Sequence, residues 1–208
     1  MSTELLEHPY ASIIYGKLHV AIGNHFGVSA LMGNLKAESG LYPDRVQGDI
    51  PYSSYSKNYT AKVDSGEISE SEFVNNGPNG GGYGLAQWTY FTRKQSLYNM
   101  YKTGYDSIGS VDLACDYLIQ ELQTDYSGVW NSLVNATSIR VASDKVLHDF
   151  ENPADQSTSV EIARASMGTE IYNTFSGGSY EEPTDTPTTT HKNKLSKLLL
   201  WAIASDIT

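Results

Sequence analysis

The 208-residue sequence predicts a mainly α-helical (α+β) fold: one domain over residues 1–176 with a short C-terminal appendage. Apolar residues recur at helical spacing through residues 9–40 and again through residues 89–175. Residues 41–83 lack that spacing and are rich in Tyr, Ser, Asn, Gly and Pro. Residues 177–193 form a Pro/Thr-rich stretch that predicts a linker, followed by a short helix or the start of a further module over residues 194–208.

Two helices are expected before residue 41. The first covers residues 9–25 and stops at Gly27, and Ser29 caps the second, which ends at Gly40. Glu38 lies three residues after Leu35, in the last turn of this second helix and on its core-facing side. A carboxylate is an unusual residue for such a position, which makes Glu38 a candidate for chemistry.

The middle segment is expected to form a small β-hairpin and loops. Residues 52–59 and 60–63 alternate in a way that favours two short strands, and residues 76–82 are a strong turn signal. About 40 weakly structured residues inside a compact domain are often functional. Helical spacing then predicts five further helices at residues 89–102, 112–122, 129–135, 139–150 and 158–175.

The charge and cysteine content exclude several classes of protein. The formal net charge of -10 leaves no basic stripe for nucleic acid and disfavours anionic membranes and walls as purely electrostatic partners. The single cysteine, Cys115, excludes an internal disulfide. The N-terminal residues do not look like a secretory signal peptide, and no apolar stretch is long enough to predict a transmembrane segment.

Two short motifs carry the expected chemistry. Residues 36–43 read KAESGLYP, and residues 82–88 read GYGLAQW. Burial raises the pKa of a carboxyl group, and a neutral carboxylic acid can protonate a glycosidic oxygen, so the first motif offers Glu38 as a general acid. The second motif offers a close backbone approach at Gly84, an amide at Gln87, and aromatic rings at Tyr83 and Trp88.

Together and in this order, the motifs resemble the goose-type lysozyme and lytic transglycosylase superfamily. The Arg-Lys-Gln that follows the second motif, residues 149–153 (DFENP), Arg164 and the later Ile171-Tyr172 are similar to the phage tail lysozyme family, over about residues 8–176. The resemblance implies a lysozyme-like helical domain acting on peptidoglycan, with the hairpin and loop region lining the cleft. It also implies that Glu38 is the catalytic glutamate and that Gln87 lines the cleft.

The expected reaction is cleavage of the β-1,4 bond between N-acetylmuramic acid and N-acetylglucosamine. Gln87 and the backbone near Gly84 would position the sugar. A sugar-facing surface would come from several aromatic side chains, namely Tyr83, Trp88 and one or more of Tyr52, Tyr55 and Tyr59. The resemblance identifies no second carboxylate, and Asp49, in a loop expected beside the cleft, is the candidate to hold a water. No metal or organic cofactor is implied.

Several alternatives stay open. A lytic transglycosylase would use Glu38 alone and form an anhydro sugar, and a non-catalytic tail module would bind the wall without cleaving it. A zinc peptidase lacks suitable histidine spacing, and a Cys115/His148 peptidase would place its nucleophile inside an apolar helix. The expected partner is bacterial peptidoglycan, with phage tail proteins as possible partners of the C-terminal segment. The expected location is the virion tail, or the cell wall after release.

Overall fold

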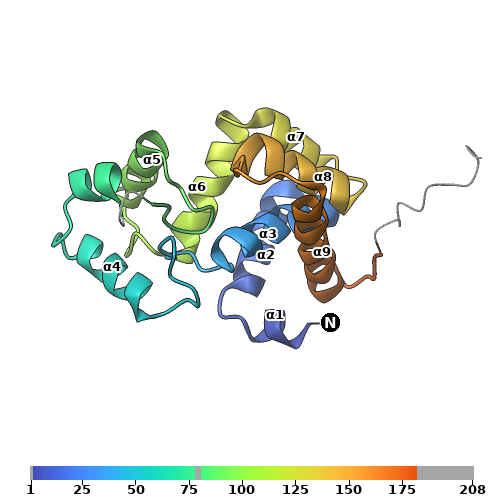
Figure 1. Ribbon diagram of the computed structural model, residues 1–208, viewed down its shortest axis with the longest axis horizontal. Coiled ribbons are helices and arrows are strands. Elements are labelled where there is room, and N and C mark those ends of the chain that lie inside the picture. Colours follow the sequence, from blue (N-terminus) through green and yellow to red (C-terminus); the bar gives the residue numbers. More distant parts are fainter. Residues whose placement is uncertain (1, 78–80, 182–208) are drawn as a thin grey trace, which may run out of the picture.

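The computed structural model describes residues 2–77 and 81–181, and they are mainly helical (Figure 1). Figure 1 shows α4 and α5 on one side of the molecule and α7, α8 and α9 on the other, with α3 and α6 between them. In chain order the helices are α1 (Thr3–Glu7), α2 (Ala11–Ile22), α3 (His25–Ser39), α4 (Ser54–Asp64), the π-helical turn η1 (Glu72–Asn76), α5 (Phe91–Tyr101), α6 (Val111–Thr124), α7 (Ser127–Val134), α8 (Ile139–Val146), the π-helical turn η3 (Leu147–Glu151) and α9 (Thr158–Phe175).

Helix α3 is the central helix of the core. Every residue from Gly27 to Leu35 is buried, and α3 packs against α2, α7, α8 and α9. The packing against α9 is close because two glycines meet there. A Cβ added at Gly33 would lie 2.6 Å from the backbone nitrogen of Gly168, so a side chain does not fit at this crossing. This contact sets the distance between α9 and the helix that carries Glu38.

The boundary between α2 and α3 differs from the expected one. Gly23 ends α2 in the left-handed conformation with φ 71°, and the side chain of Asn24 caps α3 by accepting a hydrogen bond from Gly27 N at 3.2 Å. The predictions that Gly27 stops a helix and that Ser29 caps the next one are therefore wrong. The expected end of α3 is confirmed, because Gly40 is its C-cap with φ 63°.

The predicted hairpin over residues 52–63 is also wrong, because this segment forms helix α4. The hydroxyl of Ser53 caps the helix, and Ser56, Thr60 and Val63 are buried along one face. Four- and three-residue spacings between these buried positions suit a helix, whereas the alternation read from the sequence suited a strand. Within the described residues, β-structure amounts to two isolated bridges, Val46 with Tyr83 and Tyr83 with Trp88.

The five helices expected after residue 88 are confirmed as α5, α6, α7, the α8–η3 pair and α9. Within the described residues, no helix is both long enough and apolar enough to cross a membrane. The expected helix or module at residues 194–208 and most of the expected linker lie outside the described residues.

Candidate functional site

A cleft of about 270 Å³ opens where the two expected motifs meet. We call it the Glu38 cleft. Its walls come from the end of α3, the loop after it, the loop before α5, the first turn of α5, and η3 with the residues that follow. The lining residues are Glu38, Arg45, Gln47, Gly48, Ile50, Ala86, Gln87, Thr89, Tyr90, Arg93, Glu151 and Pro153.

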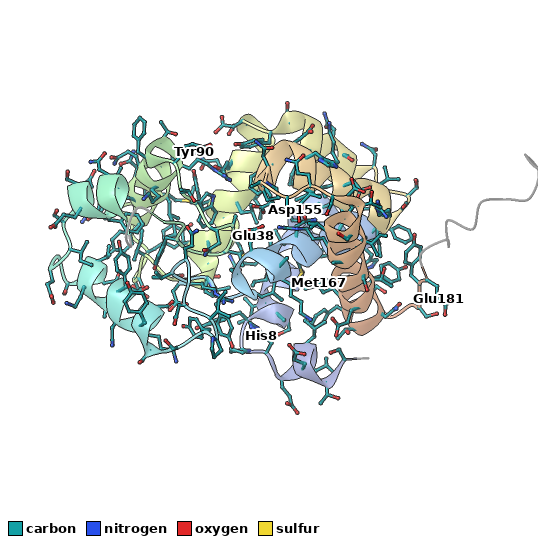
Figure 2. The ribbon with its side chains drawn as sticks, in the orientation of Figure 1. His8, Glu38, Tyr90, Asp155, Met167 and Glu181 are labelled. Carbon is teal, nitrogen blue, oxygen red and sulfur yellow. The ribbon has the colours of Figure 1, made fainter. Side chains whose placement is uncertain are left out.

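Glu38 reaches this cleft from the last turn of α3, near the middle of the molecule (Figure 2). Its Oε1 accepts a hydrogen bond from Nη2 of Arg164 at 2.5 Å. The Glu38 side chain is 21% exposed and the Arg164 side chain is 9% exposed. Arg164 belongs to α9, and its Nη1 also points at the backbone and side-chain oxygens of Asn34, at 3.4 Å each. The ion pair fixes the Glu38 carboxylate across the α3–α9 contact.

The second motif is joined to the loop after α3 by backbone and amide hydrogen bonds. Gly84 N donates to the carbonyl of Arg45 at 2.8 Å. Nε2 of Gln87 donates to the carbonyls of Arg45 and Gly84 at 3.0 and 2.9 Å, respectively. Gln87 has φ 46°, an uncommon conformation for a residue other than glycine. The structure thus brings Gln87 and Glu38 together in one cleft, as expected.

Two of the expected sugar-facing residues belong to the core instead. Tyr83 and Trp88 are both fully buried. The Tyr83 hydroxyl lies 2.7 Å from the hydroxyl of Thr60, and Trp88 Nε1 donates to Glu121 at 3.0 Å. Their rings offer no surface to a sugar, so this expectation is corrected. Both polar atoms are satisfied inside the protein, as buried aromatic residues require.

Gly84 lies next to the cleft and helps to hold its loops together. It has φ 80°, and a Cβ there would lie 2.9 Å from Cζ3 of Trp88, so only glycine fits. Both its N–H and its carbonyl are hydrogen-bonded to the two loops, and it is not among the lining residues. The expected role of its backbone in holding a sugar is replaced by a role in holding Gln87.

The three tyrosines expected from the middle segment, Tyr52, Tyr55 and Tyr59, do not line the cleft. Tyr52 stacks on Tyr42 with ring centroids 3.7 Å apart and donates to the carboxylate of Asp44 at 2.8 Å. These tyrosines lie on or next to helix α4, which forms in place of the expected hairpin.

Asp49 is placed outside the cleft as well, because its carboxylate caps α4. Its oxygens accept hydrogen bonds from the hydroxyl groups of Ser53 and Ser56 at 2.5 and 2.6 Å, and from their backbone amides at 3.0 and 3.2 Å. Burial raises the pKa of Asp49, but these hydrogen bonds outweigh it and bring the pKa down to about 2. A carboxylate that already accepts four hydrogen bonds cannot hold a catalytic water. The expectation that Asp49 is the second carboxylate is therefore corrected.

Glu151 is the carboxyl group that lines the cleft together with Glu38, and no role was expected for it from the sequence. Its Oε1 is buried and has no hydrogen-bond partner among the described residues. Burial and the nearby Glu38 raise the pKa of Glu151 to about 8, against the opposing effect of Arg93 and Arg164. The neutral form of Glu151 is therefore favoured near pH 7.

The sequence also did not point to the other side chains of the cleft. Arg93 pairs with the buried Glu121 at 2.5 Å and lies over the Phe150 ring, with its Cζ 4.7 Å from the centroid. Tyr90 stands at the cleft with its side chain largely exposed. A signal for Glu151 did exist: an acid directly after Phe150, at the end of a helical pattern and before an Asn-Pro break.

The chemistry of a cysteine peptidase is not available here. Cys115 is fully buried in α6, and burial raises the pKa of its thiol to about 12. His148 is engaged elsewhere, with Nδ1 at 2.8 Å from Gln156 and Nε2 at 2.9 Å from Glu161. Across residues 2–77 and 81–181, no group of His, Cys, Asp and Glu side chains is arranged to hold a metal ion.

Comparison with known proteins identifies the family of the chain. Residues 23–175 match the family described as phage tail lysozyme, a span that runs from the start of α3 to the end of α9 and includes every residue of the cleft. No curated protein and no solved structure matches the chain. Because the matched span covers well over half of the chain, the protein belongs to the phage tail lysozyme family.

Proposed function

We propose that this protein cleaves the glycan strands of bacterial peptidoglycan at the β-1,4 bond between N-acetylmuramic acid and N-acetylglucosamine. The observation that carries the proposal is the position of Glu38: a carboxyl group at the end of a buried helix, opening into a polar cleft. Family membership supports the same reaction. Fold alone would not support it, since unrelated functions share folds.

In the proposed reaction Glu38 acts as the general acid. It gives a proton to the glycosidic oxygen as the bond from that oxygen to the anomeric carbon breaks. The oxygen atom of an attacking hydroxyl group then bonds to the anomeric carbon, and the proton of that hydroxyl returns to Glu38. Gln87 lies at the cleft to contact the sugar. Tyr90 offers the exposed aromatic face expected earlier of Tyr83 and Trp88.

The identity of the attacking hydroxyl distinguishes two products. A hydrolase uses water, and a lytic transglycosylase uses the 6-hydroxyl of the same sugar and forms an anhydro product. Because the Asp49 carboxylate is bonded to Ser53 and Ser56, the transglycosylase route is the second candidate: it needs no separate carboxylate to hold a water.

The proposed setting is a phage tail or the host cell wall after release. The family description associates the chain with tails. Contacts with other tail proteins through the C-terminal segment are part of the proposal, and that segment lies beyond residue 181.

Mass spectrometry of purified peptidoglycan after digestion tests the function. New reducing ends on muramic acid identify a hydrolase, and anhydro-muramic ends identify a transglycosylase; either result supports glycan cleavage. Free peptide stems without shortened glycan would contradict the proposal, because they identify an amidase or peptidase. Wall binding without any cleavage would contradict it in favour of a non-catalytic tail module.

A further inference from the structure

The backbone around Glu151 projects this side chain into the cleft. Glu151 is the last residue of η3, a π-helical turn, and the next residue, Asn152, has φ 46°. Single π-turns and left-handed non-glycine residues are uncommon and concentrate at functional sites. Here they place a carboxyl group in the wall of the cleft that holds Glu38, with Oε1 buried and without a hydrogen-bond partner in residues 2–77 and 81–181.

Charged groups from four other helices act on Glu151. Glu38 of α3 and Glu121 of α6 favour its neutral form, while Arg93 of α5 and Arg164 of α9 favour its carboxylate. Arg93 is shared with Glu121 through hydrogen bonds of 2.5 and 2.8 Å. Arg164 is shared with Glu38, so this one guanidinium acts on both carboxyl groups of the cleft.

The charged residues on the elements beside Glu151 are engaged with other partners. On η3 itself, His148 pairs with Glu161, and Asp149 pairs with Lys145 of α8. On α8, Asp144 pairs with Arg140. Besides burial, these two acids and two arginines are the groups that shift the pKa of Glu151, and Arg45 is a further charged residue that lines the cleft.

A general acid at Glu38 raises a difficulty that Glu151 resolves. The Arg164 guanidinium donates a hydrogen bond to Glu38 Oε1, whereas the proposed reaction needs a proton on the Glu38 carboxyl group. Two acids in one cleft resist ionising together, so the pair retains a proton over a range in which a lone carboxyl would lose it. When that proton lies on Glu38, Arg164 and Arg93 can stabilise Glu151 as the carboxylate.

Building on the glycan cleavage proposed above, we propose that Glu38 and Glu151 hold one proton between them and that Glu151 is a positioning residue that keeps Glu38 supplied with it. Glu38 transfers this proton to the leaving oxygen, which keeps the electron pair of the broken bond. Both carboxyl groups are then anionic beside the two arginines. The hydroxyl that forms the new bond to the anomeric carbon returns its proton to the pair, so the cycle is balanced.

The pH dependence of glycan cleavage by the full chain tests this pairing. In the wild type, kcat should fall with an alkaline midpoint near the loss of the last shared proton. In Glu151→Gln the midpoint of kcat should move down by about one pH unit or more, because the second acid of the cleft has been removed and no longer retains a proton. KM and the melting temperature should change little. The matched control is Glu7→Gln, an exposed glutamate of α1, and it should keep the wild-type profile. An unchanged alkaline midpoint in Glu151→Gln would overturn the proposal.

Carbon NMR of the glutamate carboxyl groups gives a second test that needs no activity. The Glu151 carboxyl should titrate far above the ordinary glutamate range of about 4.3 in the wild type, and at lower pH in Glu38→Gln. An ordinary midpoint, or no response to Glu38→Gln, contradicts the pairing even if the protein cleaves glycan. A raised and coupled midpoint in a protein that fails to cleave glycan would overturn the proposed function alone.

Discussion

The four hydrogen bonds that Asp49 accepts from Ser53 and Ser56 make its carboxylate part of the cap of α4. We expect Asp49→Asn to lower the free energy of unfolding by about 1–2 kcal/mol, because the uncharged amide replaces an anionic acceptor and loses part of the cap. The rate of glycan cleavage by the folded variant should stay within about twofold of wild type, because Asp49 does not line the cleft.

The pH dependence of this stability follows from the lowered pKa. A carboxyl group with a folded pKa of about 2, below its unfolded value of about 3.9, stabilises the protein fully above the unfolded value. The contribution is lost as pH falls through the folded value. Urea unfolding should therefore show the largest gap between wild type and Asp49→Asn near pH 7 and a closing gap toward pH 2. A gap that is independent of pH would contradict the cap.

For single residues, the sequence predicted a position only where that position follows from local helix geometry. Glu38 could be placed at the end of α3 because Leu35 and Gly40 fix the register and the stop. Tyr83 and Trp88 could not be placed, because a glycine-rich loop has no periodicity to indicate which side chains turn inward. Their burial depends on Thr60 and Glu121, which are distant in sequence.

At the scale of elements, the crossing of α3 and α9 determines the geometry of the site. A Cβ at Gly33 would lie 2.5 Å from the carbonyl oxygen of Arg164, the residue that pairs with Glu38. We expect Gly33→Ala to cost roughly 1–3 kcal/mol of stability through overpacking, and to reduce cleavage by displacing Arg164. Chemical denaturation and the initial rate of glycan cleavage measure the two effects.

Gly16 provides the matched control for this substitution. It lies within α2, and no atom lies within 4 Å of an added Cβ. Gly16→Ala should raise the free energy of unfolding by about 0.5–1 kcal/mol, as alanine does in an open helix position. Equal effects of the two substitutions would show that the α3–α9 crossing is not tight.

Most of the helices were predictable, while α1, η1, the type of α4 and the boundary between α2 and α3 were not. Long apolar periodicities gave α5 to α9, because a helix that buries one face repeats at 3.6 residues. Helix α4 was read as strand because its polar face alternates by chance, and its cap depends on Asp49. The Gly23–Asn24 boundary was missed because Gly27 offered an equally plausible stop in the sequence.

At the scale of the whole molecule, the net charge of -10 opposes approach to anionic cell walls. Raising the ionic strength from about 10 mM to about 150 mM shortens the Debye length from roughly 30 Å to 8 Å and weakens that repulsion. Cleavage of intact walls should therefore be unchanged or faster at the higher salt concentration. A steep loss of rate with salt, while neutral chito-oligosaccharides are unaffected, would contradict this view and indicate electrostatic attraction to the wall.

The proposed role of Glu38 as the general acid is tested by one rate comparison. The initial rate at which reducing or anhydro ends appear from purified peptidoglycan is measured for Glu38→Gln, Glu7→Gln and wild type. We expect a loss of about 10²–10⁴-fold for Glu38→Gln in a protein that remains folded, although its melting temperature falls because Arg164 loses its anionic partner, and wild-type rates for Glu7→Gln. Cleavage by folded Glu38→Gln at a rate close to that of wild type would contradict it.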